Sequence, residues 1–217
     1  MKVVCLRKSN TVYSSNSYLV LGDWNRLDDV NAVIDAGPNP YLVTEIEGTH
    51  TGFGKVPVEQ IVLTHGHSDH TAGAAALQAR YGATVCAYVA TGGVDRLLAD
   101  GERLRLGDRE HEVIHAPVHS SDSICLYCAD EGVLFTGDTP LRILTPTGTH
   151  DERFAVLLER LLTLDVRRIY PGHDEPITSG AMSMLRETLR NVNGSIGRQT
   201  GEMRATVMAA PWAPVAC

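Results

Sequence analysis

The sequence lacks long hydrophobic runs, an even set of cysteines and an excess of positive charge, and each absence excludes a class of protein. No stretch approaches the roughly 20 apolar residues of a membrane-spanning helix, and the first residues, MKVVCLRKSN, contain no run of signal-peptide length. We therefore expect no membrane association. The 5 cysteines form no disulfide framework, which favours a reduced, cytoplasmic chain.

Acidic residues outnumber basic ones by 26 to 19, so the formal net charge is −7. Such a chain is poorly suited to a nucleic-acid backbone, and we expect no nucleic-acid partner. Hydrophobic residues make up 43% of the 217 residues, which is enough for an ordinary core, and no low-complexity linker divides them. We expect a single domain over residues 1–217.

Short apolar segments predict strands, and the segments between them predict helices. Strands are expected at 2–7, 16–22, 31–37, 58–65, 83–89, 111–119, 123–128, 132–138 and 166–173. Helices are expected at 41–47, 71–81 (ending at Gly82), 91–100, 149–164 (from a Thr149–Glu152 capping box) and 179–192 (ending at Asn193-Gly194). Strands followed by helices, twice over, predict an α/β protein with two sheets back to back and helices outside.

The segment THGHSDHTAG, residues 64–73, places three imidazoles and a carboxylate within six positions. At the end of a strand, His65 and His67 would share one side, whereas Asp69 and His70 lie where the chain turns into a helix. One turn thus offers two pairs of ligands aimed at neighbouring points. A catalytic zinc ion takes three protein ligands, so further ligands must come from other strand ends.

Three later strands end in suitable residues. His119 follows HEVIHAPV, Asp138 follows GVLFTG, and His173 follows VRRIYPG. Together with the first segment they supply five imidazoles and two carboxylates. This set is enough for two metal ions, and a carboxylate such as Asp138 can bridge both.

With these residues in view, the sequence resembles the metallo-β-lactamase superfamily, and the pattern is most similar to that of the glyoxalase II-like hydrolases. The resemblance rests on THGHSDH, His119, FTGD and PGH, and it spans about residues 16–175. It implies a four-layer αββα sandwich and two divalent metal ions, with zinc expected first and iron or manganese as alternatives. The implied ligands are His65, His67 and His119 for the first ion, Asp69, His70 and His173 for the second, and Asp138 between them.

The resemblance also implies the reaction. A hydroxide held by the two metals would attack a small ester, thioester or lactone, with Asp69 and Asp138 as catalytic residues. Asp35, at the end of a strand, is either a turn residue or a hydrogen-bond partner of a ligand. The implied partner is a small-molecule substrate, and a homodimer stays open.

Three alternatives remain open from the sequence. The first is an oxidoreductase similar to the persulfide dioxygenases, with a single iron held by His65, His119 and Asp138. The second is a non-catalytic metal-binding or sensing protein with the same fold. A phosphodiesterase or nuclease is the third, which the acidic charge disfavours.

Several residues depart from the family pattern. The third histidine stands in Pro-Val-His-Ser-Ser-Asp instead of a P-G-H-T-x-G stretch, so Asp122 is an addition. The segment after Asp138, TPLRILTPTGTHDE, is neither Arg-rich nor Gly-rich, and no clear basic pair follows His173. Both features count against a glutathione thioester as the substrate. The lactonases often carry a Tyr soon after the bridging Asp, and no Tyr stands there in this chain. The true β-lactamases carry cysteine in place of the bridging Asp, so Asp138 separates this chain from them.

Other conspicuous residues are expected to be structural. Cys125 and Cys128 form a C-x-x-C within a strand, which would point them to opposite faces as ordinary core cysteines. The remaining histidines, His50, His111, His115 and His150, are expected to lie outside the metal site. The apolar tail from residue 204 is expected to dock on another surface, and with segment 139–150 it would line the pocket or a dimer contact.

Overall fold

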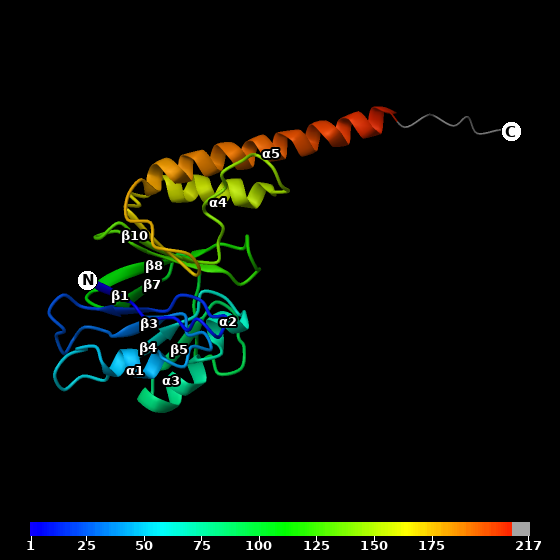
Figure 1. Ribbon diagram of the computed structural model, residues 1–217. Coiled ribbons are helices and arrows are strands. Elements are labelled where there is room, and N and C mark those ends of the chain that lie inside the picture. Colours follow the sequence, from blue (N-terminus) through cyan, green and yellow to red (C-terminus); the bar gives the residue numbers. More distant parts are fainter. Residues whose placement is uncertain (210–217) are drawn as a thin grey trace. The chain divides into compact units, whose positions relative to one another are not determined.

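The computed structural model describes the backbone of residues 1–209 and the side chains of residues 1–198 (Figure 1). The chain divides into two compact units: unit 1 comprises residues 1–140 with 164–181, and unit 2 comprises residues 141–163 with those from 182 onward. The expectation of one domain over residues 1–217 stays a prediction. Within the described residues, no helix is both long and apolar enough to cross a membrane.

Unit 1 contains two sheets. The first is six-stranded, in the order β1-β2-β3-β4-β5-β6. Its strands are β1 (Lys2–Cys5), β2 (Tyr18–Leu21), β3 (Ala32–Ile34), β4 (Gln60–Val62), β5 (Thr84–Ala87) and β6 (Arg96–Leu97). Strands β3 to β6 pair in parallel, so their carboxyl ends meet at one edge of the sheet.

The second sheet is five-stranded, in the order β11-β10-β9-β8-β7. Its strands are β7 (Arg103–Leu106), β8 (Arg109–His115), β9 (Ile124–Cys128), β10 (Val133–Gly137) and β11 (Arg168–Pro171). Strands β10 and β11 are parallel, whereas β9 is antiparallel to both β8 and β10. Consequently β8, β10 and β11 all run in the same direction, and their carboxyl ends share one edge.

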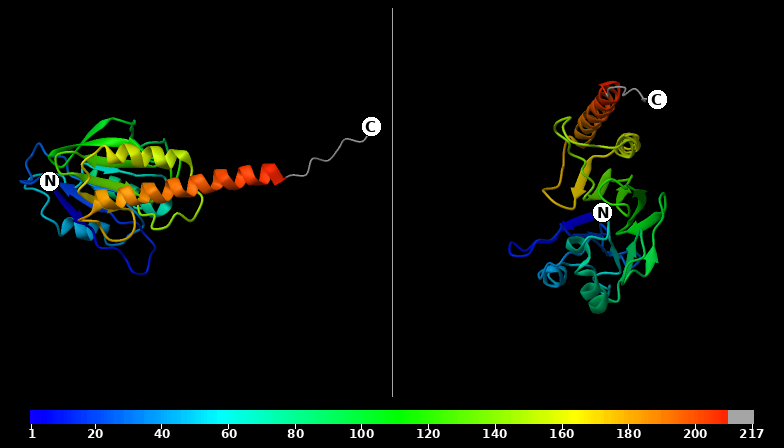
Figure 2. Two further views of the ribbon diagram at one scale, coloured as in Figure 1. Left: turned by 90° about the horizontal axis from the view of Figure 1, so that it is seen from above. Right: turned by 90° about the vertical axis from the view of Figure 1, so that its right-hand side faces the viewer.

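Two apolar cores account for this layering. Side chains from both sheets, including Tyr18, Val62, Leu126 and Phe135, form the core between the sheets. The outer face of the six-stranded sheet packs against α1 (Leu42–Glu47) and α3 (Ala74–Tyr81) through residues such as Ile46 and Leu77. Figures 1 and 2 show both helices on the side of this sheet that faces away from the five-stranded sheet. The predicted back-to-back sheets are therefore confirmed.

Unit 2 contains α4 (Glu152–Leu162) and almost all of α5 (Ala181–Ala209). The predicted capping box at Thr149 is wrong, because Asp151 is the N-cap and its side chain accepts a hydrogen bond from Phe154 N–H. The predicted end of the last helix at Asn193-Gly194 is also wrong, because α5 continues through both residues. Contacts within unit 2 override the stop signal: Asn191 donates to the Ile143 carbonyl, and Ser195 donates to the Gly148 carbonyl.

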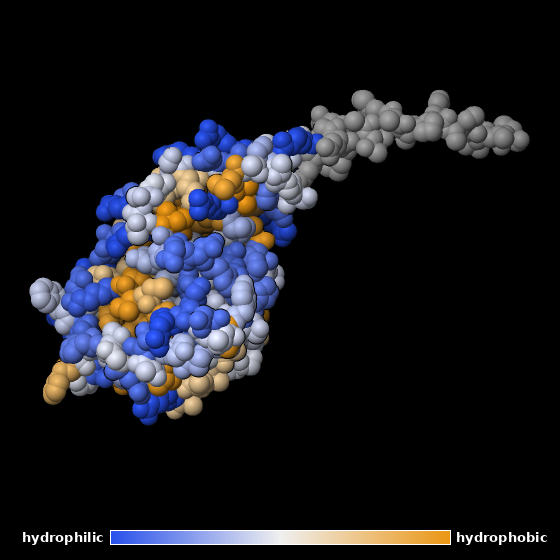
Figure 3. All heavy atoms as spheres, in the orientation of Figure 1, coloured by the Kyte–Doolittle hydropathy of each residue, from blue (hydrophilic) through white to orange (hydrophobic). Residues whose placement is uncertain are grey.

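One further prediction in unit 1 is corrected. Residues 91–100 form a turn and strand β6 rather than a helix, because the Asp95 carboxylate accepts the Val85 N–H and aligns Arg96–Leu97 beside β5. Strand β7 was not predicted. The interpretation of the C-x-x-C is confirmed, because Cys125 and Cys128 are buried cysteines without a disulfide, three positions apart on β9. Hydrophilic side chains cover most of the face seen in Figure 3.

His111 is a buried titratable group in the core, and it predicts an acid-sensitive fold. Its side chain is 0% exposed on β8, and burial lowers its pKa from 6.5 to about 4. The unfolded chain therefore takes up a proton before the folded one as the pH falls below 6.5. The free energy of unfolding is unaffected above that pH and falls between pH 6.5 and pH 4. The loss is about 2 kcal/mol at pH 5 and reaches about 3 kcal/mol below pH 4.

We expect His111→Leu to reduce the loss of stability between pH 7 and pH 5 by about 2 kcal/mol, as measured by urea unfolding at both pH values. Val113→Ala, on the same strand, is the control, because it removes core volume without a titratable group. It should destabilise the fold equally at both pH values. An unchanged pH dependence in His111→Leu would show that His111 is not the acid-sensitive group.

Candidate metal centre

The carboxyl ends of the strands in both sheets carry the residues that the sequence singled out. Asp35 follows β3, and the segment after β4 carries the histidine motif, which enters α2 (Ser68–Thr71). In the second sheet, Asp138 follows β10 directly, His173 comes two residues after β11, and His119 lies in the loop after β8. The strand directions described above therefore place all seven predicted ligands in one region.

The first group consists of His65, His67 and His119, whose ligand atoms all lie within 4.8 Å of one another. His119 Nε2 is 3.0 Å from His67 Nδ1, and the ring centroids of His65 and His67 are 4.6 Å apart. The expectation that His65 and His67 share one side of a strand end is wrong, because β4 ends at Val62 and the backbone bends before His65. The bend, not the strand period, brings them together.

The second group consists of Asp69, His70, Asp138 and His173, again within 4.8 Å. His173 Nε2 is 3.1 Å from Asp69 Oδ2, and His70 Nε2 is 3.0 Å from Asp138 Oδ1.

Asp138 also reaches the first group. Its Oδ2 is 3.7 Å from His119 Nε2 and 4.0 Å from His65 Nε2. This carboxylate therefore lies between the two groups, as a bridging ligand would.

The chemistry of these atoms fits metal ions. The Nε2 atoms of His65 and His70 and Oδ1 of Asp138 are buried without a well-aligned hydrogen bond from the described side chains. Burial lowers the pKa of His65 to about 4, so its imidazole is neutral and can act as a ligand at neutral pH. Burial opposes protonation of His70 as well, but the carboxylates of Asp35 and Asp138 outweigh it and raise its pKa. A cation is thus stabilised at this position.

Asp35 orients the His70 ring from the side opposite the second group of ligand candidates. The Asp35 carboxylate is 2% exposed and accepts three hydrogen bonds of 2.8 Å, from Thr64 N–H, Thr64 O–H and His70 Nδ1–H. The hydrogen-bonding role considered for Asp35 is therefore confirmed, although its φ of 56° also makes it a turn residue. With Nδ1 bonded to Asp35, His70 presents Nε2 to the second group.

The turn that carries His173 depends on residues far away in the sequence, which sequence reasoning missed. Asn16 Nδ2 donates to the carbonyls of Pro171 and Asp174, and Tyr18 O–H donates to Pro171. Gly172 is required here by close approach, because a Cβ atom would lie 2.3 Å from Asp138 Oδ1. The only signal was a polar Asn16 before the apolar β2, which does not reveal its partner 155 residues later.

Tyr13 was missed as well. Its ring stacks on His173 with centroids 5.2 Å apart, and its hydroxyl lies 3.4 Å from His173 Nε2. The Tyr13 side chain is 75% exposed, so the second group lies beneath a solvent-facing phenol.

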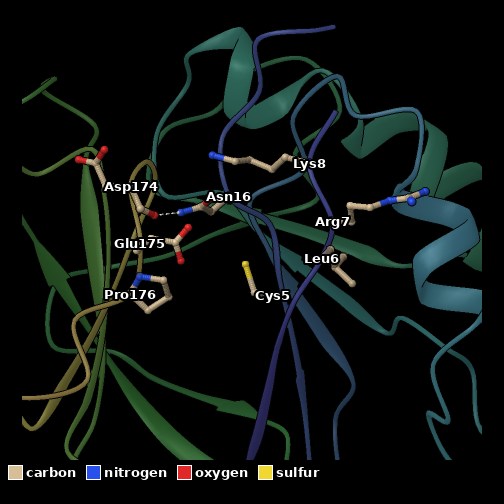
Figure 4. A pocket seen from close by; sticks show the side chains of 8 residues that line it. All are labelled: Cys5, Leu6, Arg7, Lys8, Asn16, Asp174, Glu175 and Pro176. Atoms are coloured by element: carbon tan, nitrogen blue, oxygen red, sulfur yellow. Dashed lines mark hydrogen bonds between the residues drawn. The ribbon is translucent and has the colours of Figure 1, made fainter. Parts of the chain in front are cut away.

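A hollow of about 490 Å³ lies beside the turn that follows His173. Figure 4 shows the Cys5 thiol and the Glu175 carboxylate pointing into it, with Lys8 at its margin. Burial raises the pKa of Cys5, and Glu175 adds to the shift, so this thiol stays protonated at neutral pH. The hollow therefore offers a polar surface of mixed charge.

A family model decides the identity of the fold. The model of the metallo-beta-lactamase superfamily matches residues 10–95 and 88–173 of the chain. This chain belongs to the metallo-beta-lactamase superfamily. Both groups of ligand candidates fall within the matched residues, and the two sheets with their helices are the fold expected from the sequence.

Individual relatives support the same assignment. A hydroxyacylglutathione hydrolase of Cereibacter sphaeroides is 42% identical over 84 residues, which cover 37% of this chain and 33% of the relative. An atrochrysone carboxyl ACP thioesterase of Aspergillus novofumigatus is 27% identical over 209 residues, which cover 87% of this chain and 63% of the relative. The chain thus spans between a third and two thirds of the length of these relatives.

Among solved structures, ETHE1 from Myxococcus xanthus matches with a TM-score of 0.68 at 21% identity, covering 98% of this chain and 93% of that chain. At this identity the likeness shows the fold alone.

The remaining histidines lie outside both groups of described residues. His50 is hydrogen-bonded to Asn25, His115 stacks on Tyr88, and His150 contacts Phe154. The predicted docking of the tail from residue 204 lies outside the described side chains.

Proposed function

We propose that this chain is a dinuclear metal-dependent hydrolase that cleaves a small thioester, with esters and lactones as the related substrate classes. The observation that carries the proposal is the position of Asp138, whose carboxylate reaches both groups. Its Oδ1 lies 3.0 Å from His70, and its Oδ2 lies 3.6 Å from His173 and 3.7 Å from His119. A carboxylate that joins two sets of metal-binding side chains is suited to a pair of ions. Zinc is the expected metal.

The proposed roles of the residues follow from their places. Bound metal ions would lower the pKa of a water molecule and polarise the substrate carbonyl. Asp69 approaches His173 and His70 through Oδ2, so its other oxygen is the proposed acceptor of the proton of the attacking water. Asp35 fixes the ring of His70, and Asn16 fixes the turn that carries His173.

The thioester class is favoured by two considerations. A thiol has a pKa of about 8.5, so a thiolate leaves without prior protonation and the reaction needs only a nucleophile and a polarised carbonyl. The names of two relatives, a hydroxyacylglutathione hydrolase and an ACP thioesterase, both describe thioester hydrolysis. The hollow beside His173 offers polar groups for the thiol carrier.

The test combines metal analysis with an activity panel. Protein purified without added metal should contain two divalent ions per chain and hydrolyse a glutathione or acyl-carrier thioester faster than the matching oxygen ester. Wild-type protein loaded with two ions that cleaves no thioester, ester or lactone would contradict the proposal. A single iron with oxygen consumption on a glutathione persulfide would instead support the dioxygenase alternative.

A further inference from the structure

Asp122 lies outside both groups of ligand candidates, yet it joins the two segments that carry the first group. We call residues 64–67 the histidine turn and residues 116–123 the His119 loop. The Asp122 carboxylate lies against the backbone of Gly66, which stands between His65 and His67. It also accepts the Ser120 hydroxyl at 2.6 Å within its own loop.

The packing at Gly66 is independent evidence of this contact. A Cβ atom on Gly66 would lie 3.0 Å from Asp122 Oδ2, which is tighter than an ordinary contact. The carboxylate therefore rests directly on the backbone of the histidine turn, and a larger residue 66 would require the carboxylate to shift.

A backbone hydrogen bond joins the same segments on the other side of His65. Ile124 N–H, just after the His119 loop, donates to the Thr64 carbonyl at 2.8 Å. The loop is further braced internally, because Ser120 N–H donates to Ser123 Oγ and Ser123 N–H donates to the Ser120 carbonyl. Thus a backbone hydrogen bond before His65 and a carboxylate contact after it hold the histidine turn against the His119 loop.

We propose that Asp122 is a positioning residue that holds His67 against His119 and so presets the three-histidine group for its metal ion. His67 and His119 are exposed side chains, unlike the buried His65, so packing alone does not fix them. The contact at Gly66 holds the turn in the position where His67 Nδ1 and His119 Nε2 stand 3.0 Å apart. This inference rests on the proposed metal site, but the contact itself can be tested without a metal.

The metal test uses Asp122→Ala, Asp122→Asn and the control Ser121→Ala, whose exposed side chain lies in the same loop. Titration with Co²⁺, followed by visible absorption, should show a loss of affinity of about 10- to 100-fold at the three-histidine group in Asp122→Ala. Affinity at the second group and the melting temperature of the metal-free protein should be unchanged. Asp122→Asn keeps an oxygen for Gly66 N–H and should recover most of the affinity, and Ser121→Ala should match the wild type.

Wild-type affinity at both groups in Asp122→Ala would overturn the inference, as would an equal loss at both groups with a lower melting temperature. Hydrogen exchange at the Gly66 amide of the metal-free protein supplies the independent reading. The exposed Gly66 amide should exchange more slowly in the wild type than in Asp122→Ala, and equal rates would refute the contact even if the wild type bound no metal. A wild type without two metals would refute the proposed function alone.

Discussion

Asp138→Asn is expected to lower kcat/KM by about 1,000-fold or more, which corresponds to about 4 kcal/mol of lost transition-state stabilisation. The reason is geometric. The two Asp138 oxygens approach His70 and His119, one from each group, and an amide nitrogen would replace one of them without a lone pair for a metal. The measurement is kcat/KM on the active thioester together with metal content per chain.

The control for this substitution is Asp130→Asn, which makes the same chemical change at an exposed position on the turn before β10. It should leave both activity and metal content at wild-type values. A variant Asp138→Asn that retains two ions and more than a tenth of the activity would show that the carboxylate does not join the two groups.

Asp35→Ala is expected to destabilise the metal-free protein by about 3 kcal/mol or more. It removes the acceptor of three hydrogen bonds and leaves Thr64 N–H, Thr64 O–H and His70 Nδ1–H buried without a partner, at about 1–3 kcal/mol for each unsatisfied group. Alanine at the Asp35 φ of 56° adds about 1 kcal/mol of backbone strain. Urea unfolding of the metal-free variant measures the sum.

Two companion variants separate the causes. Asp174 also has a positive φ, of 63°, but its side chain is exposed, so Asp174→Ala should cost only the backbone strain. Asp35→Asn tolerates the backbone and keeps one oxygen, so it should fold more stably than Asp35→Ala while weakening metal binding at the second group by about 10- to 100-fold. Equal stability of Asp35→Ala and Asp174→Ala would contradict the hydrogen-bonding role of Asp35.

Residues that act through their position at a strand end were predictable from the sequence. The strands that precede Asp138 and His173 are largely apolar and end in turn residues, so strand direction brings these residues to a common edge. The histidine motif carries its own bend, and the family resemblance grouped it with the later residues. The two back-to-back sheets followed from the order of strands and helices, whereas the αββα sandwich was implied by the family resemblance.

Features that depend on contacts between distant segments were not predictable. Asn16 donates to the carbonyl of Pro171, 155 residues later, and nothing in the local sequence around Asn16 predicts that contact. Gly194 is an ordinary helix stop, but α5 continues because Asn191 and Ser195 bond to the segment before α4. Gly92 and Gly93 weaken the predicted helix at 91–100, and the Asp95 contact with Val85 then favours an edge strand.

The support of the His173 turn by Asn16 and Tyr18 also bears on the order of folding. The second group cannot be complete until residues near the amino end of the chain have met residues near 172, so it closes one of the longest loops in unit 1. Contacts of such long sequence separation form late, after local elements are in place. A metal ion bound there would therefore stabilise the finished structure by mass action rather than direct its early folding. Added metal should then slow unfolding more than it accelerates refolding.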